Sequence, residues 1–180
     1  NKKPDVEIYS ESKLSWDDKK DLLYNNNVLT IYKNELRLFI DKIGGFRIIN
    51  GSKIGWFKIN EDINDQYIRT YLLGSAISAL LIQRGYLILH GNSLTKNNKT
   101  IICLGDTGIG KSTTAYSLMQ NGWKLLSDDL VAIDENYNVL PGIPRIKLSK
   151  DAINHYSLKV SESKKIMHNI NKYIIDGPLI

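Results

Sequence analysis

Eight consecutive residues near the middle of the chain have the types and spacing of a phosphate-binding loop. Gly105, Gly110, Lys111 and Ser112 occupy the fixed positions of the pattern G-x-x-x-x-G-K-[ST]. In such a loop the glycines let backbone N–H groups turn toward phosphate oxygens, the lysine reaches the β- and γ-phosphates, and the hydroxyl ligates Mg²⁺. We therefore predict nucleotide binding, with Mg²⁺ as cofactor, by the residues Gly105, Asp106, Thr107, Gly108, Ile109, Gly110, Lys111, Ser112 and Thr113.

The residues on either side of this loop have the patterns that the motif requires. Residues 100–104 are a short β-branched and apolar run, which is typical of a buried strand. Residues 113–120, followed by Asn121-Gly122, indicate a helix that ends at a glycine. Strand, glycine loop and helix in this order favour phosphate binding over a chance match.

A pair of carboxylates, Asp128 and Asp129, follows the loop after a single predicted helix. The pair interrupts a predicted strand over residues 123–133, which returns the two side chains toward the loop. Phosphoryl transfer to an alcohol needs one carboxylate near Mg²⁺ and another near the incoming hydroxyl. An acidic turn at the end of a strand is the alternative interpretation.

The composition indicates a globular chain without a membrane span. The 180 residues carry a net charge of +5 and contain no long basic block, which favours anionic ligands such as nucleotides and gives no reason to expect nucleic acid as a partner. No apolar run reaches the length of a membrane span, and no secretory segment is visible. We therefore expect a cytoplasmic protein with no membrane partner.

Hydrophobic periodicity divides the chain into a small β-rich unit, residues 1–64, and a larger unit, residues 65–180. The first contains a predicted hairpin over residues 46–59 with Asn50-Gly51 at its turn, preceded by a break at Gly44-Gly45. Residues 65–84 carry a wide apolar stripe with helical spacing, and we expect a core helix that joins the two units.

The second unit is predicted to be α/β with a mixed sheet. Residues 86–94 and 100–104 read as strands separated by a connection so short that the pair must be antiparallel, which differs from the usual βαβ entry to a nucleotide-binding loop. Residues 139–148 look extended, and Ser149 is a candidate cap for a short helix over residues 151–158.

His90 ends the apolar run Leu87-Ile88-Leu89 of the first of these predicted strands and precedes Gly91. From the residues alone, it is either a histidine at a strand end whose hydrogen bonds are satisfied or a catalytic group, and the first alternative is the more frequent.

Three segments together resemble the catalytic domain of HPr kinase/phosphorylase. They are Leu89-His90-Gly91, the loop Gly105–Ser112, and the stretch from Asn121-Gly122 to Ser127-Asp128-Asp129. The resemblance implies a P-loop kinase fold of the phosphoenolpyruvate-carboxykinase type, with His90 in the active site, Lys111 on the phosphates and Ser112 on Mg²⁺. It also implies that Asp129 is the base that takes the serine proton, and we expect Asp128 to serve the metal with Ser112.

The chain departs from that family in two respects. No Glu-Ile-Arg-Gly-Leu-Gly segment follows Asp129, and the family's large N-terminal domain has no counterpart. The segments around Tyr71–Gly74, Gln83–Gly85 and Leu140–Leu148 resemble instead the stand-alone HPr-kinase-like proteins of peptide-modification clusters, some of which phosphorylate a serine of a lasso precursor peptide. In those relatives more chain follows a segment like Lys172–Ile175.

These observations predict a kinase that uses ATP or GTP and Mg²⁺ to phosphorylate a serine-bearing peptide or protein. A regulatory module that binds nucleotide without transferring phosphate, and a kinase of a small alcohol such as free serine, are the alternatives. The family resemblance also makes a homo-oligomer an expectation.

Overall fold

The computed structural model describes residues 4–12, 16, 21–143, 145–161, 165–167 and 170–176. The chain is mixed α/β and richer in strand than in helix. It divides into two compact units, Asn1–Gly85 and Tyr86–Ile180. The division falls after Gly85 and not after residue 64, because the helix that follows residue 64 packs into the core of the N-terminal sheet.

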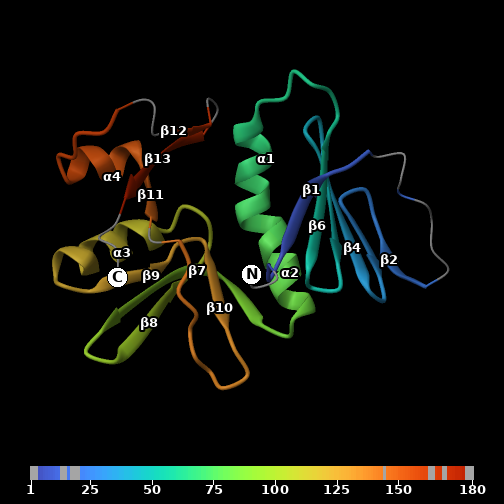
Figure 1. Ribbon diagram of the computed structural model, residues 1–180. Coiled ribbons are helices and arrows are strands. Elements are labelled where there is room, and N and C mark those ends of the chain that lie inside the picture. Colours follow the sequence, from blue (N-terminus) through green and yellow to red (C-terminus); the bar gives the residue numbers. More distant parts are fainter. Residues whose placement is uncertain are drawn as a thin grey trace. The chain divides into compact units, whose positions relative to one another are not determined.

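The first unit is built on one twisted sheet (Figure 1). Its strands are β1 (Glu7–Ser10), β2 (Leu22–Asn25), β3 (Leu29–Tyr32), β4 (Glu35–Ile40), β5 (Gly44–Ile49) and β6 (Lys53–Lys58). They lie in the order β1-β6-β5-β4-β3-β2, and every pairing is antiparallel except that of β1 with β6. Asn50 and Gly51 have φ values of 50° and 58° and form the turn between β5 and β6, so the predicted hairpin is confirmed.

The sequence predicted a break in regular structure at Gly44-Gly45. In the structure these two glycines are instead the first residues of strand β5. A Cβ atom on Gly44 would lie 2.0 Å from the Phe57 carbonyl oxygen, and one on Gly45 would lie 2.7 Å from the Phe57 ring. Glycine is therefore required here by the close approach of a neighbouring strand, which a sequence pattern cannot distinguish from a turn.

One face of this sheet is covered by a helical segment that matches the predicted helix. It consists of α1 (Asp65–Tyr71), a π-helical turn (Leu72–Ala76) and α2 (Ile77–Gln83). Asn64 caps α1 by accepting a hydrogen bond from the Gln66 N–H. The buried residues of this core are Phe46, Ile48, Ile54, Ile68, Ala76, Ala79 and Leu80.

The second unit is centred on the long strand β7 (Leu87–Lys96). Strand β8 (Lys99–Leu104) pairs with it antiparallel, as predicted, through a turn in which Asn97 and Asn98 have positive φ. Strands β9 (Lys124–Ser127) and β10 (Leu130–Ile133) also run antiparallel to β7. Asp128 and Asp129 lie between these two strands, so the predicted interruption is observed.

Helix α3 (Lys111–Gln120) follows the glycine loop and packs between β7 and β11 (Arg145–Ser149). Strand β11 forms a small antiparallel sheet with β13 (Ile170–Asp176) and β12 (Lys165–Met167). Ser149 caps α4 (Lys150–His155) by accepting from the Ala152 N–H, as expected. The buried residues of this core are Leu94, Ala115, Tyr116, Leu125, Ile146, Leu148, Ala152, Ile153 and Tyr173.

Candidate functional site

The glycine loop joins β8 to α3 and contains three glycines in the left-handed region. The φ angles of Gly105, Gly108 and Gly110 are 147°, 89° and 102°. Residues with a Cβ atom rarely adopt these angles, so the backbone of the loop requires glycine at each position. Gly110 directly precedes α3, whose first N–H groups carry the partial positive charge of a helix N-terminus.

The Lys111 ammonium is held by the loop itself. Its Nζ donates to the Gly105 carbonyl at 2.7 Å and to the Asp106 carbonyl at 3.0 Å. The side chain therefore spans the loop from its last residues to its first, and it adds a full positive charge to that of the helix terminus. An anion at the loop would meet both charges.

The Asp128 carboxylate contacts the loop serine and is held by two further donors. Its Oδ1 accepts from the Ser112 hydroxyl at 3.5 Å and from the Asn92 amide. Its Oδ2 accepts from the backbone N–H of Lys147 at 2.7 Å. The structure thus brings together the two residues that we expected to serve a metal ion.

Asp129 has a strained backbone and an ion-paired side chain. Its φ is 66°, a conformation that residues other than glycine rarely adopt and that recurs at functional sites. Its Oδ2 lies 2.5 Å from the Lys147 Nζ. Its carbonyl oxygen accepts from the His90 Nδ1 at 2.9 Å and from the Gly91 N–H at 3.3 Å, so β7 fixes the direction of this residue.

The two neighbouring carboxyls have pKa values displaced in opposite directions. Burial, with a contribution from the negative charge of Asp129, raises the pKa of Asp128 to about 6. Burial acts in the same direction on Asp129, but the positive charge and hydrogen bond of Lys147, helped by Lys172 and His90, lower the pKa of Asp129 below its ordinary value. Asp129 is therefore ionised at neutral pH, and Asp128 gains a proton more easily.

Close backbone approaches support this arrangement. A Cβ atom on Gly91 would lie 2.5 Å from the Cys103 carbonyl oxygen, and one on Gly142 would lie 2.8 Å from the Ser127 Cβ. Ser127, directly before the aspartate pair, is buried and shares a hydrogen bond of 2.6 Å with Ser93. The strand end that carries the aspartates is thus closely packed on both sides.

Two residues of the site were not predicted from the sequence. Asn92 is only 1% exposed and donates to Asp128, and Lys147 contacts Asp128 through its backbone and Asp129 through its side chain. The sequence signal that could have marked Asn92 as a site residue was its polar side chain within a strand that is otherwise largely apolar. His90, by contrast, was named from the resemblance as an active-site residue; its side chain is exposed and its Nδ1 donates to the Asp129 carbonyl.

The oxygen donors of the site fit Mg²⁺ in the way that kinases hold it. Mg²⁺ keeps several waters and takes one or two protein ligands together with phosphate oxygens, and Ser112 with Asp128 is such a pair. Within the described part of the chain, no group of three or more His, Cys, Asp or Glu residues gathers that could hold a metal ion. Ser112 and Asp128 would therefore share the ion with a bound nucleotide.

Comparison of the chain with protein-family models, with curated proteins and with solved structures found no match. The likeness to HPr kinase therefore depends on the motifs alone, and the function is argued below from the residues of the site. Among the described helices, none has the length and apolar character needed to cross a membrane.

Proposed function

We propose that this chain is an Mg²⁺-dependent kinase that transfers the γ-phosphoryl group of ATP to a serine hydroxyl of a peptide or protein. The observation that carries the proposal is the position of the aspartate pair: Asp128 contacts the loop serine, while the adjacent Asp129 is oriented by β7 and ion-paired with Lys147. A module that only binds nucleotide needs no second carboxylate at this place.

The loop N–H groups and Lys111 would bind the phosphates and neutralise their charge. Mg²⁺, held by Ser112 and Asp128, supplies further charge neutralisation when bound. The serine oxygen of the acceptor forms a bond to the γ-phosphorus, the bond from that phosphorus to the bridging oxygen of ADP breaks, and the serine proton passes to Asp129. The products are ADP and phosphoserine.

A carboxylate with a lowered pKa is a weak base, yet it suits this reaction. Phosphoryl transfer passes through a loose transition state in most analyses, so the acceptor hydroxyl needs little deprotonation before the phosphorus–oxygen bond breaks. Asp129 has only to orient the hydroxyl and accept its proton late. Lys147 and His90 hold the carboxylate and the backbone of Asp129 for that task.

Asp128 has the pKa closer to neutrality and is the rival for the role of base. Both of its oxygens, however, accept hydrogen bonds from Asn92, Ser112 and Lys147. A carboxylate engaged in this way is directed at the loop serine, which favours the metal role for Asp128 and leaves the acceptor side to Asp129.

The test is transfer of labelled phosphate from ATP and, in parallel, from GTP. The acceptors are serine-bearing peptides encoded beside this gene, HPr protein and free serine. We expect the peptides to be labelled and Lys111→Ala to abolish labelling in a folded protein, since the Lys111 ammonium donates to two carbonyls of the loop and lies outside the buried core. Labelling of free serine alone would favour the small-alcohol kinase, and ATP binding without any transfer would favour the regulatory module.

A further inference from the structure

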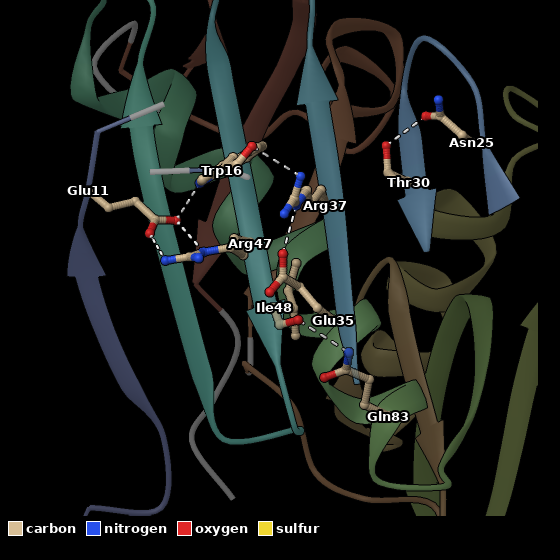
Figure 2. Close-up of polar contacts among 9 residues, drawn as sticks. All are labelled: Glu11, Trp16, Asn25, Thr30, Glu35, Arg37, Arg47, Ile48 and Gln83. Carbon is tan, nitrogen blue, oxygen red and sulfur yellow. Dashed lines mark hydrogen bonds and ion pairs between the residues drawn. The ribbon is translucent and has the colours of Figure 1, made fainter. Parts of the chain in front are cut away.

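The face of the N-terminal sheet that points away from α1 and α2 carries buried charge. Arg37 forms an ion pair with Glu35 at 2.7 Å, and Arg47 forms one with Glu11. Trp16 joins the two pairs, since its Nε1 donates to Glu11 at 3.0 Å and its carbonyl accepts from Arg37 at 3.5 Å (Figure 2). Buried ion pairs contribute little to stability relative to apolar residues of similar volume, so a gain in stability does not explain the polar character of this face.

A cavity of about 210 Å³ opens on the same face. Its lining residues are Trp16, Asn26, Asn27, Val28, Thr30, Arg37 and Phe39. The volume is below the roughly 300 Å³ at which pockets for small-molecule ligands begin, and it suits a single side chain.

The chemistry of the cavity favours an uncharged and aromatic side chain. Glu35 neutralises Arg37, whose guanidinium carbon lies 4.7 Å from the Tyr32 ring centroid and 5.6 Å from that of Trp16. The Trp16 and Phe39 rings meet edge to face at 6.1 Å. A ring inserted here would contact aromatic edges and the Arg37 guanidinium, whose positive charge is balanced by Glu35, so the pair as a whole has no net charge to attract a carboxylate.

Strand β2, which leads directly into the rim of this cavity, is an exposed apolar edge. It lies last in the sheet and, within the described residues, pairs only with β3. Leu22, Leu23 and Tyr24 are 50%, 69% and 49% exposed. The opposite edge strand, β1, carries instead the ion pair of Glu7 with Lys53, and charge is the usual means of protecting a sheet edge.

We propose that β2 and this cavity form a docking site for an extended peptide segment. The peptide adds as a strand to the outer edge of β2, and an apolar or aromatic side chain enters the cavity beyond Asn25, where residues 26–28 form the rim. Backbone hydrogen bonds at a sheet edge supply affinity and side-chain pockets supply specificity in this mode of recognition. The site shares no residue with the phosphate-binding loop or the aspartate pair.

A peptide fits this edge better than a second copy of the chain. The four residues of β2 span only about 13 Å, and pairing two such strands buries far less than the roughly 800 Å² per partner of a stable dimer. A peptide gains the edge and the cavity together. If the proposed kinase function holds, the site gives the enzyme a second contact with its peptide substrate.

The probe is a short peptide selected from a random phage-display library for binding to the whole chain. The strongest binder is synthesised, and its affinity is measured by fluorescence anisotropy in the absence of nucleotide. Leu23→Lys and Val28→Trp should each weaken binding by at least about tenfold, the first by placing charge on the edge and the second by filling the cavity. Ile8→Lys, on the opposite edge strand, is the matched control and should bind like the parent.

Methylation of successive peptide nitrogens tests the binding mode on the parent protein, so no variant has to fold. Only alternate N–H groups of an added strand point at β2, and binding should therefore be lost at every second position. The proposal is overturned if no peptide is enriched, if methylation shows no alternation, or if the binder ignores both Leu23→Lys and Val28→Trp. A dimer seen by sedimentation and removed by Leu23→Lys would assign the edge to a second copy and overturn it too. These binding measurements do not involve phosphate transfer, so they would still test the docking site if the kinase proposal failed.

Discussion

A single lysine holds two adjacent aspartates that have opposite electrostatic environments. The backbone of Lys147 donates to Asp128, and its ammonium pairs with Asp129. Asp128, the more buried of the two, faces the loop serine and has a raised pKa. Asp129, which forms the ion pair with Lys147, has a lowered pKa. Neighbouring carboxyls whose environments displace their pKa values in opposite directions are suited to different chemical tasks.

Asp129→Asn is therefore expected to abolish transfer and to leave nucleotide binding intact. Asparagine keeps the shape and one acceptor oxygen but cannot take the serine proton, and loss of a general base typically costs on the order of 10²- to 10⁴-fold in rate. Calorimetry gives the nucleotide affinity and single-turnover assays give the rate. Asp128→Asn is the comparison and should mainly weaken the dependence on Mg²⁺; transfer by Asp129→Asn at the parent rate would remove Asp129 from the mechanism.

The pKa of Asp128 makes stability depend on pH. Its folded value of about 6 lies above its ordinary value of 3.8, so between these two pH values the folded chain holds a proton that the unfolded chain has released. Stability should fall as pH rises through this window, by up to about 3 kcal/mol, and stay lost above it. Asp129, with a lowered pKa, contributes in the opposite sense only at lower pH.

Urea unfolding from about pH 4 to pH 7, without nucleotide or Mg²⁺, measures this slope. The slope should disappear in Asp128→Asn and persist in a variant of the exposed Asp62, Asp62→Asn. Equal slopes in the parent and Asp128→Asn would contradict the assignment.

At the scale of elements, the strand, loop and helix around Gly105–Ser112 could be predicted because each leaves a local pattern of spacing and turn residues. The contacts of Asn92 and Lys147 with the aspartates could not be predicted from the sequence. They depend on the pairing of β7 with β9 and on the place where β11 passes the aspartates, and no local sequence pattern determines either of these. The break predicted at Gly44-Gly45 was wrong for a related reason, because the close approach of β6 that requires glycine there is a feature of the tertiary structure. The kinase roles of His90, Lys111, Ser112, Asp128 and Asp129 remain predictions.

The conformation of the loop leads to a prediction with a matched control. A Cβ atom on Gly110 or on Gly85 would meet nothing within 4 Å, yet both residues have positive φ, 102° and 85°. Alanine at either position should cost stability through backbone strain of order 1–3 kcal/mol. Only Gly110→Ala should also weaken ATP binding, by about tenfold or more, because relaxation of the strain turns loop N–H groups away from the phosphates. Equal affinity of the two variants in calorimetry would show that the loop geometry does not determine binding.

At the scale of the whole molecule, the two units have separate cores. The buried residues of the first core belong to Asn1–Gly85, and those of the second belong to Tyr86–Ile180. The loop, His90, the aspartate pair and Lys147 all lie in the second unit, whereas the proposed peptide site lies in the first. Nucleotide binding should therefore depend on the second core alone.

Phe46→Ala and Leu125→Ala test this separation in the intact chain. Both parent residues are fully buried, one in each core, and each truncation should cost roughly 2–5 kcal/mol of the stability of its own unit. Scanning calorimetry should show ATP and Mg²⁺ raising the melting temperature of one transition, because a ligand stabilises only the folded unit that binds it. We expect Phe46→Ala to lower the other transition and keep the parent's nucleotide affinity. Leu125→Ala should lower the nucleotide-sensitive transition and weaken the apparent affinity once that unit is partly unfolded. A single transition displaced equally by both substitutions, with parallel losses of affinity, would mean that the nucleotide site requires the folded N-terminal sheet.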